Sequence, residues 1–160
     1  MLTDPHDEVG VSTGPFRLDE SIPGTLRVQT GRPQLTIGLH GLACRWAVRL
    51  DDVWVEAMRD RPTQSYNFGW WDAQVRHYVA RPTTEQYFGL GERSGGMDRA
   101  GRRYRLSNID ALGYDARSSD PLYKHMPFFI TRKPGIGSSA AGLCFGVFYD
   151  TLSDCVFDFG

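Results

Sequence analysis

The chain has 160 residues, of which 41% are apolar and 23% are charged, and its formal net charge is −1. These values are typical of a folded protein and exclude general disorder, and the near-neutral charge gives no overall attraction to nucleic acid or to an anionic membrane. No apolar run approaches the roughly 18 residues that a membrane span needs. The first residues hold no basic segment followed by an apolar one, so we expect no signal peptide, no membrane partner and a cytoplasmic protein.

Apolar residues recur at every second position through most of the chain, which is the pattern of half-buried β-strands. In CRWAVRL, for example, Cys44, Trp46 and Val48 share one face, and two arginines share the other. The strands predicted on this basis are, in chain order, Phe16–Leu18, Thr25–Gln29, Leu35–Leu39, Cys44–Leu50, Val53–Ala57, Val75–Arg81, Arg102–Ser107, Pro127–Thr131, Gly142–Tyr149 and Cys155–Phe159. Turn residues separate them, and no segment sustains an amphipathic helical pattern. We therefore predict an all-β fold, an antiparallel β-sandwich, that forms one domain over residues 1–160.

The sequence contains no recognisable metal or redox motif. Cys44, Cys144 and Cys155 lie among apolar residues and form no CxxC pair, so we expect reduced cysteines at core positions. The four histidines show no metal-ligand spacing. We predict neither a metal site nor a cofactor.

A glycine-rich stretch, YFGLGERSGG at residues 87–96, interrupts the strand pattern. Four glycines within eight residues indicate backbone that approaches a neighbour closely or adopts positive φ. The stretch is not a dinucleotide-binding loop, because Ser94 replaces the third glycine and no helix follows. It is not a P-loop either, because Met97 and Asp98 occupy the lysine and serine or threonine positions.

Basic residues surround and follow the glycines, at Arg93, Arg99, Arg102, Arg103 and Arg105. Acidic residues lie among them, and a single aromatic residue, Tyr104, accompanies them. A solvated strand face explains this pattern better than a nucleic-acid patch does. We predict no nucleic-acid partner.

A long polar stretch, SNIDALGYDARSSDPLYKH, occupies residues 107–125 and breaks the alternation of strands and short turns. Loops of this length in a compact domain are usually functional. We therefore expect this loop to take part in binding.

Five features occur in order, namely YFGLGERSG, a glycine-centred turn, RRYRLSNIDALGYD, DPLYKHMPFFI and GLCFGVFYD. Together they resemble glycoside hydrolase family 31, which contains α-glucosidases and α-xylosidases, over about residues 86–159. The resemblance implies an N-terminal β-sandwich, similar to galactose mutarotase, that packs against a catalytic (β/α)8 barrel. It also implies that the GLGE turn approaches neighbouring backbone near the barrel and that the following loop leans over the active-site mouth.

The resemblance also implies a site residue and a substrate, an α-linked oligosaccharide or glycoside. Family members project an aspartate from this loop to bind substrate hydroxyls, and Asp110 in SNIDALGYD matches it. A carboxylate accepts charge-assisted hydrogen bonds from hydroxyls. The residues alone favour an Asx-turn or a loop cap, but with the resemblance we predict Asp110 as a substrate-binding residue. Asp115, Asp120 and Tyr123 are further candidates for lining the site, although Asp120-Pro121 is also a turn signal.

The chain lacks the catalytic carboxylates and the barrel of glycoside hydrolase family 31. Retaining glycosidases need two carboxylates about 5–5.5 Å apart, and the W-x-D-M-N-E motif that holds the family's nucleophile does not occur here. A barrel needs about 250 residues of its own. The sequence also stops at Gly160, directly after the strand-like VFDFG. We therefore predict no catalytic residue in this chain, which we interpret as the N-terminal portion of a glycosidase, inactive alone and partnered by its own barrel.

Two alternative functions stay open. A mutarotase-like epimerase would need a glutamate base and a histidine acid. Its candidate residues are Glu85 and Glu92, combined with His77 or His125. A stand-alone carbohydrate-binding module would stack sugars on aromatic side chains, for which Trp70 and Trp71 are the candidates.

Overall fold

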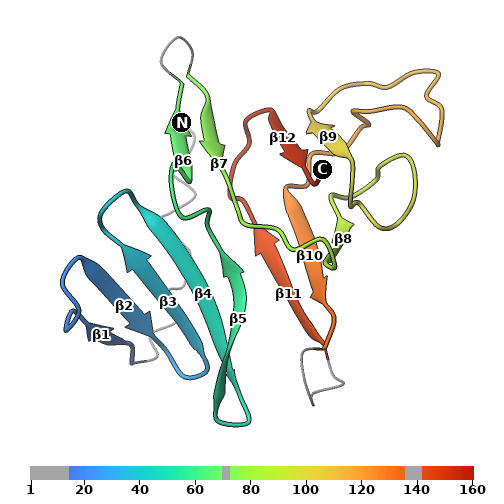
Figure 1. The fold of residues 1–160 in the computed structure, drawn as a ribbon. Coiled ribbons are helices and arrows are strands. Elements are labelled where there is room, and N and C mark those ends of the chain that lie inside the picture. Colours follow the sequence, from blue (N-terminus) through green and yellow to red (C-terminus); the bar gives the residue numbers. More distant parts are fainter. Residues whose placement is uncertain (1–14, 70–72, 136–141) are drawn as a thin grey trace. The chain divides into compact units, whose positions relative to one another are not determined.

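The computed structural model describes residues 15–69, 73–135 and 142–160. Trp70 and Trp71, the candidates for sugar stacking, lie outside these ranges. The chain divides into two compact units, Met1–Ala80 and Arg81–Gly160, and both are built from strands and loops (Figure 1). Within the described ranges the structure contains no helix, and thus none that could span a membrane.

A five-stranded antiparallel sheet forms most of the first unit, and its strand order follows the chain (Figure 1). Its strands are β1 (Arg17–Asp19), β2 (Thr25–Gln29), β3 (Pro33–Gly38), β4 (Ala43–Leu50) and β5 (Val53–Arg59). The turn from β4 to β5 places Asp51 and Asp52 at positive φ, as the turn signal at these residues predicts. A separate hairpin pairs β6 (Tyr66–Phe68) with β7 (Val75–His77).

The register of this sheet separates a polar face from an apolar one. Thr36 on β3 lies between Arg27 and Arg45, its partners on the two neighbouring strands. Because successive residues of a strand face opposite sides, the adjacent Leu35 and Ile37 belong to the other face. The alternation seen in the sequence therefore has a direct structural meaning.

The second unit contains two smaller antiparallel groups. Its strands are β8 (Gln86–Gly89), β9 (Arg103–Leu106), β10 (Phe128–Lys133), β11 (Leu143–Phe148) and β12 (Cys155–Asp158). β10 lies between β11 and β8, and β12 pairs with β9. The glycine-rich stretch is thus partly a strand, because β8 pairs with β10 up to Gly89 opposite Phe129.

The core of the second unit is largely aromatic. It consists of Tyr87, Leu90, Tyr104, Leu106, Phe129 and Phe159. Phe159 stacks on Tyr87 with ring centroids 4.7 Å apart and meets Phe129 edge-on at 5.2 Å. Each such pair contributes about 0.5–1.5 kcal/mol beyond the burial of its area. Through these contacts, Phe159 near the end of the chain packs against both β8 and β10.

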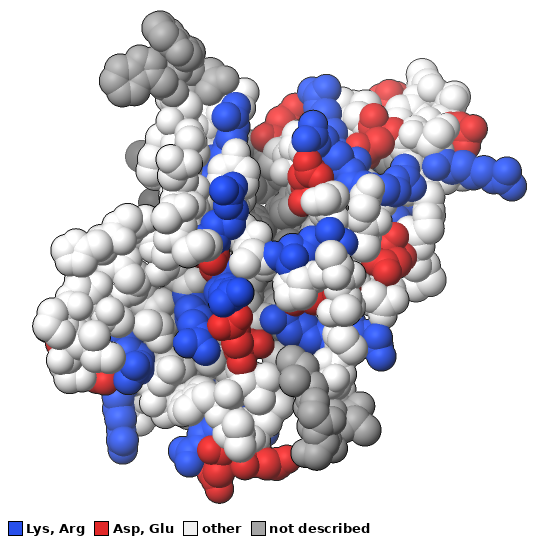
Figure 2. All heavy atoms as spheres, in the orientation of Figure 1, with Lys and Arg blue, Asp and Glu red and all other residues white. Residues whose placement is uncertain are grey.

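Charged side chains of both signs are mixed on the face seen in Figure 2, where acidic groups lie next to many of the basic ones. Close ion pairs account for part of this mixture. Arg45 Nε lies 2.7 Å from Glu56 Oε2 in the first unit, and Arg103 Nη2 lies 2.6 Å from Asp158 Oδ2 in the second. Arg45, Arg103 and Asp158 are exposed and Glu56 is half-buried, so each pair contributes little to stability.

The prediction of an all-β, antiparallel chain is confirmed, and every predicted strand overlaps an observed one. The prediction missed β6 and β8, and Val75–Arg81 proves to be a strand only as far as His77, followed by an isolated bridge between Val79 and Asp60. A single domain over residues 1–160 stays a prediction.

The prediction for the cysteines is partly wrong. All three thiols are free, and Cys155 packs against the aromatic core as expected. Cys144, however, is exposed on β11. Val147 on the same strand packs against the core, and strand alternation therefore directs Cys144 to the opposite face.

Candidate functional site

The loop of residues 107–127 connects β9 to β10 and carries Asp110, the predicted sugar contact. The Asp110 side chain is exposed. No hydrogen bond or ion pair joins it to another described residue, so it does not act there as an Asx-turn or loop cap. Its carboxylate oxygens are free to accept hydrogen bonds from hydroxyls. This accessibility fits the predicted role, and the contact with a sugar itself stays a prediction.

The two ends of the loop are tied to each other and to a neighbouring turn. Ser107 Oγ donates a hydrogen bond to Asp154 Oδ1 at 2.8 Å. The backbone N–H of His125 donates to Asn108 Oδ1 at 3.2 Å, and His125 Nε2 lies 3.0 Å from the carbonyl oxygen of Thr151. Residues 107 and 108, which precede Asp110, are therefore hydrogen-bonded both to the end of the loop and to the turn at residues 151–154.

The further candidates in this loop have structural partners of their own. The backbone N–H of Asp115 donates to Ser119 Oγ at 2.8 Å, in a local turn. The Tyr123 hydroxyl donates to the carbonyl oxygen of Ala111 at 3.1 Å, and its ring meets that of Tyr114 edge-on at 6.1 Å. These contacts give the loop internal order, and the sugar-lining role predicted for Asp115 and Tyr123 stays a prediction.

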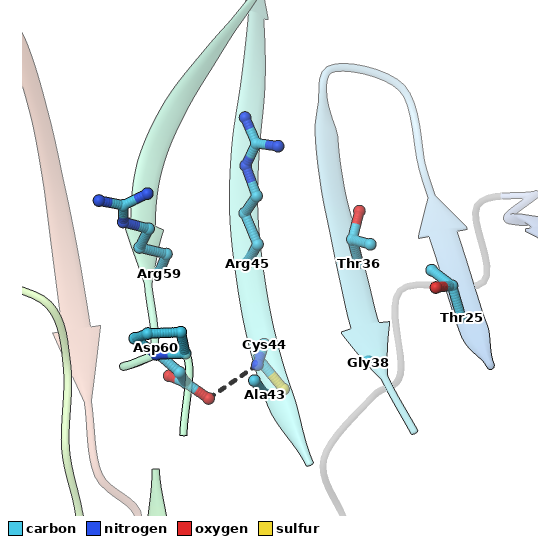
Figure 3. A pocket seen from close by; sticks show the side chains of 9 residues that line it. Thr25, Thr36, Gly38, Ala43, Cys44, Arg45, Arg59 and Asp60 are labelled. Atoms are coloured by element: carbon cyan, nitrogen blue, oxygen red, sulfur yellow. Dashed lines mark hydrogen bonds between the residues drawn. The ribbon is translucent and has the colours of Figure 1, made fainter. Parts of the chain in front are cut away.

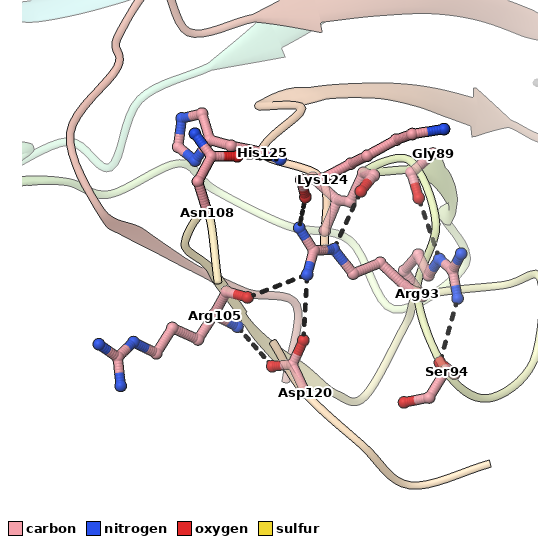
Figure 4. A network of polar contacts seen from close by, with 10 residues as sticks. Gly89, Arg93, Ser94, Arg105, Asn108, Asp120, Lys124 and His125 are labelled. Atoms are coloured by element: carbon pink, nitrogen blue, oxygen red, sulfur yellow. Dashed lines mark hydrogen bonds and ion pairs between the residues drawn. The ribbon is translucent and has the colours of Figure 1, made fainter. Parts of the chain in front are cut away.

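Arg93 extends its side chain from the glycine-rich turn into the base of the loop (Figure 4). Its Nε donates to the carbonyl oxygen of Leu90 at 3.0 Å, and its Nη1 donates to that of Arg105 at 3.3 Å. Nη2 donates to the carbonyl oxygen of Lys124, and Nη1 lies 3.5 Å from Asp120 Oδ1. The other Asp120 oxygen accepts the N–H of Arg105 at 2.6 Å. Asp120 thus acts here as a partner of Arg93 and β9.

The expectation of a solvated arginine face is wrong for Arg93 and Arg99. The Arg93 side chain is 0% exposed; burial lowers the pKa of its guanidinium, and the Asp120 carboxylate opposes that effect. Arg99 is buried too, and donates to the carbonyl oxygens of Gly89 at 3.1 Å and Gly96 at 2.8 Å. Arginine tolerates such burial because its N–H groups fan out to several acceptors.

Glycine is required in this turn because the backbone lies against β10. A Cβ atom on Gly89, where φ is +118°, would lie 2.8 Å from the carbonyl oxygen of Phe128. A Cβ atom on Gly91 would lie 3.2 Å from Met126 Cβ. The prediction of close approach to neighbouring backbone is confirmed within this unit, and proximity to a barrel stays a prediction.

Asp98 stabilises the same turn from its far end. Its Oδ1 accepts the backbone N–H groups of Tyr87 at 3.1 Å and Ala100 at 3.0 Å. Burial acts to raise the pKa of this carboxyl, but these hydrogen bonds outweigh burial and lower the pKa below its ordinary value. The aspartate that excluded a P-loop on sequence grounds thus has a structural role.

A separate hollow of about 300 Å³ lies in the first unit, against the five-stranded sheet (Figure 3). It is lined by Thr25, Thr36, Gly38, Ala43, Cys44, Arg45, Arg59, Asp60 and Pro62. Asp60 Oδ2 accepts the Cys44 N–H at 2.8 Å, and Asp60 Oδ1 lies 2.7 Å from His77 Nε2. Both carboxylate oxygens are therefore engaged in joining β4 to the β6–β7 hairpin. Among the residues that the structure describes, no group of His, Cys, Asp and Glu could hold a metal ion.

Residues 2–158 match the family model of the glycosyl hydrolase 31 N-terminal galactose mutarotase-like domain. The chain belongs to this family. The resemblance to glycoside hydrolase family 31 and the predicted fold class, a galactose mutarotase-like antiparallel β-sandwich, are confirmed.

Two sequence relatives of this glycosyl hydrolase 31 domain are α-glucosidases. An α-glucosidase of Saccharolobus solfataricus is 37% identical over 76 residues, which is 48% of this chain and 10% of that protein. An α-glucosidase 2 of Bacillus thermoamyloliquefaciens is 29% identical over 75 residues, which is 47% of this chain and 9% of that protein. The matched part of the chain thus spans about a tenth of the length of these relatives.

Solved structures similar to the glycosyl hydrolase 31 domain include a family 31 dextranase of Flavobacterium johnsoniae. A mutant of it complexed with isomaltotriose has a TM-score of 0.70 and 24% sequence identity, with 91% of this chain and 16% of that chain covered. The dextranase complexed with glucose gives the same TM-score and coverage at 25% identity. These similarities show the fold.

Within the second unit of this glycosyl hydrolase 31 domain, both candidate glutamates of an epimerase have lysine or tyrosine partners. Glu85 is buried, accepts the Tyr87 hydroxyl at 2.6 Å, and lies 3.0 Å from Lys133 Nζ. Glu92 lies 2.7 Å from Lys124 Nζ. Within the described part of the second unit, neither glutamate hydrogen-bonds to His125.

Proposed function

We propose that this chain is the N-terminal domain of an α-glycosidase, an α-glucosidase in particular, that hydrolyses O-glycosidic bonds with retention of configuration. The observation that carries the proposal is the family match over residues 2–158, together with relatives that are much longer α-glucosidases. The proposed substrate is an α-linked oligosaccharide or glycoside, and the proposed location is the cytoplasm.

In this proposal the chain supplies no catalytic carboxylate. The nucleophile and the acid/base, which retention requires about 5–5.5 Å apart, belong to a barrel in the rest of the protein. The domain packs on that barrel and lends it the loop of residues 107–127. Its contribution is to bind and orient the sugar, which lowers the entropic part of the barrier.

Asp110 is the residue proposed to contact the sugar. Its exposed carboxylate has no partner among the described residues, while the loop on either side is fixed through Asn108 and His125. An unengaged acceptor on an anchored loop is suited to bind hydroxyls at little cost in entropy.

The product of the full-length protein tests this proposal. p-Nitrophenyl α-glucoside, whose leaving group has no anomeric centre, would be incubated with the enzyme in an NMR tube. The anomeric proton signals of the released glucose would be followed from the first minutes. The proposal requires α-glucose to appear first and to equilibrate later. Initial release of β-glucose, or no hydrolysis of any α-glucoside offered, would contradict it.

A further inference from the structure

We infer that Arg93 is a positioning residue for Asp110, because its buried guanidinium ties the strand that enters the loop carrying this aspartate to the second half of that loop. The inference rests on the proposed function, in which Asp110 contacts the sugar. Arg93 lies in the glycine-rich turn, outside the loop, so its proposed influence on a sugar is indirect and passes through the loop.

The contacts of Arg93 connect the strand before the loop with the second half of the loop. Arg105, whose carbonyl oxygen Nη1 contacts at 3.3 Å, belongs to the strand that enters the loop. Asp120, 3.5 Å from Nη1, lies within it. Lys124, whose carbonyl oxygen accepts from Nη2, lies where the chain returns toward β10. One side chain therefore joins the strand before the loop to two nearby points in the loop's second half.

The connection continues toward Asp110 through one further hydrogen bond. Lys124 is followed by His125, whose N–H donates to Asn108 Oδ1 at 3.2 Å. Asn108 lies two residues before Asp110 in SNID. Figure 4 shows Asn108 and His125 beside the Arg93 network. Displacement of the Lys124 carbonyl would therefore move the support of the segment that carries the aspartate.

Only arginine among the natural side chains can make this set of contacts. Its planar fork presents five N–H donors in fixed directions, whereas the lysine ammonium is a single compact charge on a flexible stem. Substitution of Arg93 by lysine keeps the charge near Asp120 but cannot hold the carbonyl oxygens of Leu90, Arg105 and Lys124 together. A misplacement of about 1 Å can reduce catalysis as much as 100-fold.

Arg99 provides a matched control. It is also buried and also donates to backbone carbonyl oxygens, those of Gly89, Ser94 and Gly96. All of these acceptors belong to the glycine-rich turn, and none belongs to the loop of residues 107–127. Arg99→Lys therefore disturbs the turn but leaves the Arg93 contacts with Arg105, Asp120 and Lys124 in place. The turn keeps one bond of its own to the loop, from the Gly95 N–H to the Ala116 carbonyl oxygen at 3.2 Å.

The test is a double-mutant cycle in the full-length enzyme, with kcat and KM measured on maltose and isomaltotriose. Arg93→Lys and Asp110→Ala are made singly and together, alongside Arg99→Lys with and without Asp110→Ala. We expect Arg93→Lys to lower kcat/KM by about tenfold or more, and to have little further effect once Asp110 is already alanine. Arg99→Lys should have a small effect that is equal in both backgrounds.

The outcomes of this cycle distinguish the positioning role of Arg93 from the sugar contact of Asp110. Arg93→Lys could lower kcat/KM equally in the wild-type and Asp110→Ala backgrounds, or it could leave kcat/KM unchanged. Either result would overturn the positioning role of Arg93 and leave the sugar contact of Asp110 intact. Unchanged kinetics in Asp110→Ala would remove the sugar contact, and with it the role of Arg93. If Arg93→Lys does not fold, Asp120→Asn replaces it in the same cycle. This change removes the charge beside Arg93, while the one remaining side-chain oxygen can still accept the Arg105 N–H. An effect independent of Asp110 would again overturn the inference.

Discussion

The carbonyl oxygen of Phe128 lies 2.8 Å from the position that a Cβ atom on Gly89 would take. The glycine-rich turn thus touches the strand that follows the substrate-binding loop of our proposal. Because Gly89 also has a φ of +118°, both the backbone conformation and the available space exclude a side chain there.

Gly89→Ala should therefore strongly destabilise the protein. We expect a loss of roughly 2–4 kcal/mol in the free energy of unfolding, from backbone strain and from the contact with β10. Urea-induced unfolding measures the loss. Gly101→Ala is the matched control, because Gly101 also has positive φ but no atom within 4 Å of its Cβ position; it should lose about 1 kcal/mol. Equal losses in the two variants would refute the role of close approach.

The aromatic core gives a second prediction. Leu106 on β9 is 0% exposed, so Leu106→Ala should cost about 2–5 kcal/mol, because a cavity is left in the core. Leu152 is 91% exposed, and Leu152→Ala should change stability by less than about 0.5 kcal/mol. A small effect of Leu106→Ala in the same unfolding measurement would show that the core is not built around this residue.

Acid should weaken the glycine-rich turn through Asp98. The pKa of this carboxyl is lowered in the folded state, because the hydrogen bonds from Tyr87 and Ala100 outweigh the effect of burial. The unfolded state therefore binds the proton more readily. The stabilisation is present above the ordinary aspartate pKa and is lost as the pH falls below it and through the lower folded pKa. Asp98→Asn should be less stable than wild type at pH 7 and should lose less stability on acidification. An unchanged slope of stability against pH in the variant would contradict this assignment.

The two-residue alternation of apolar and polar side chains predicts most of the fold. Strands such as β4 direct alternate residues toward the same face, and this alternation is visible in the sequence. β8 escaped prediction because its apolar residues, Tyr87 and Phe88, stand directly before the glycines, whose turn character dominates the local pattern. Cys144 was misplaced for a related reason. Its apolar neighbours indicate a strand, but they do not fix which of two faces points toward the core.

The predicted site was only partly accessible to sequence reasoning. Asp110 lies in a long polar loop, and its exposed carboxylate agrees with that pattern. Arg93 gave no comparable signal. An arginine in a glycine-rich turn resembles a surface charge, and its burial depends on carbonyl oxygens of Arg105 and Lys124 that approach it only in the folded structure.

The sugar contact itself is tested by Asp110→Ala in the full-length enzyme. We expect kcat/KM to fall by roughly tenfold or more, since hydrogen bonds to charged groups contribute about 1.5–3 kcal/mol. Because Asp110 is exposed and bonds to no described residue, the urea midpoint should not change. The control is Asp52→Ala in the β4–β5 turn, another exposed aspartate, whose kinetics should match wild type. If the two variants show the same kinetics, Asp110 does not contact substrate.

The central claim is that residues 1–160 form a wall of a sugar site whose reaction centre lies elsewhere in the protein. Glucose release from maltose, measured side by side for purified residues 1–160 and for the full-length enzyme, tests it most directly. We predict turnover by the full-length enzyme and a rate indistinguishable from buffer for residues 1–160. Glucose released by residues 1–160 alone would contradict the account.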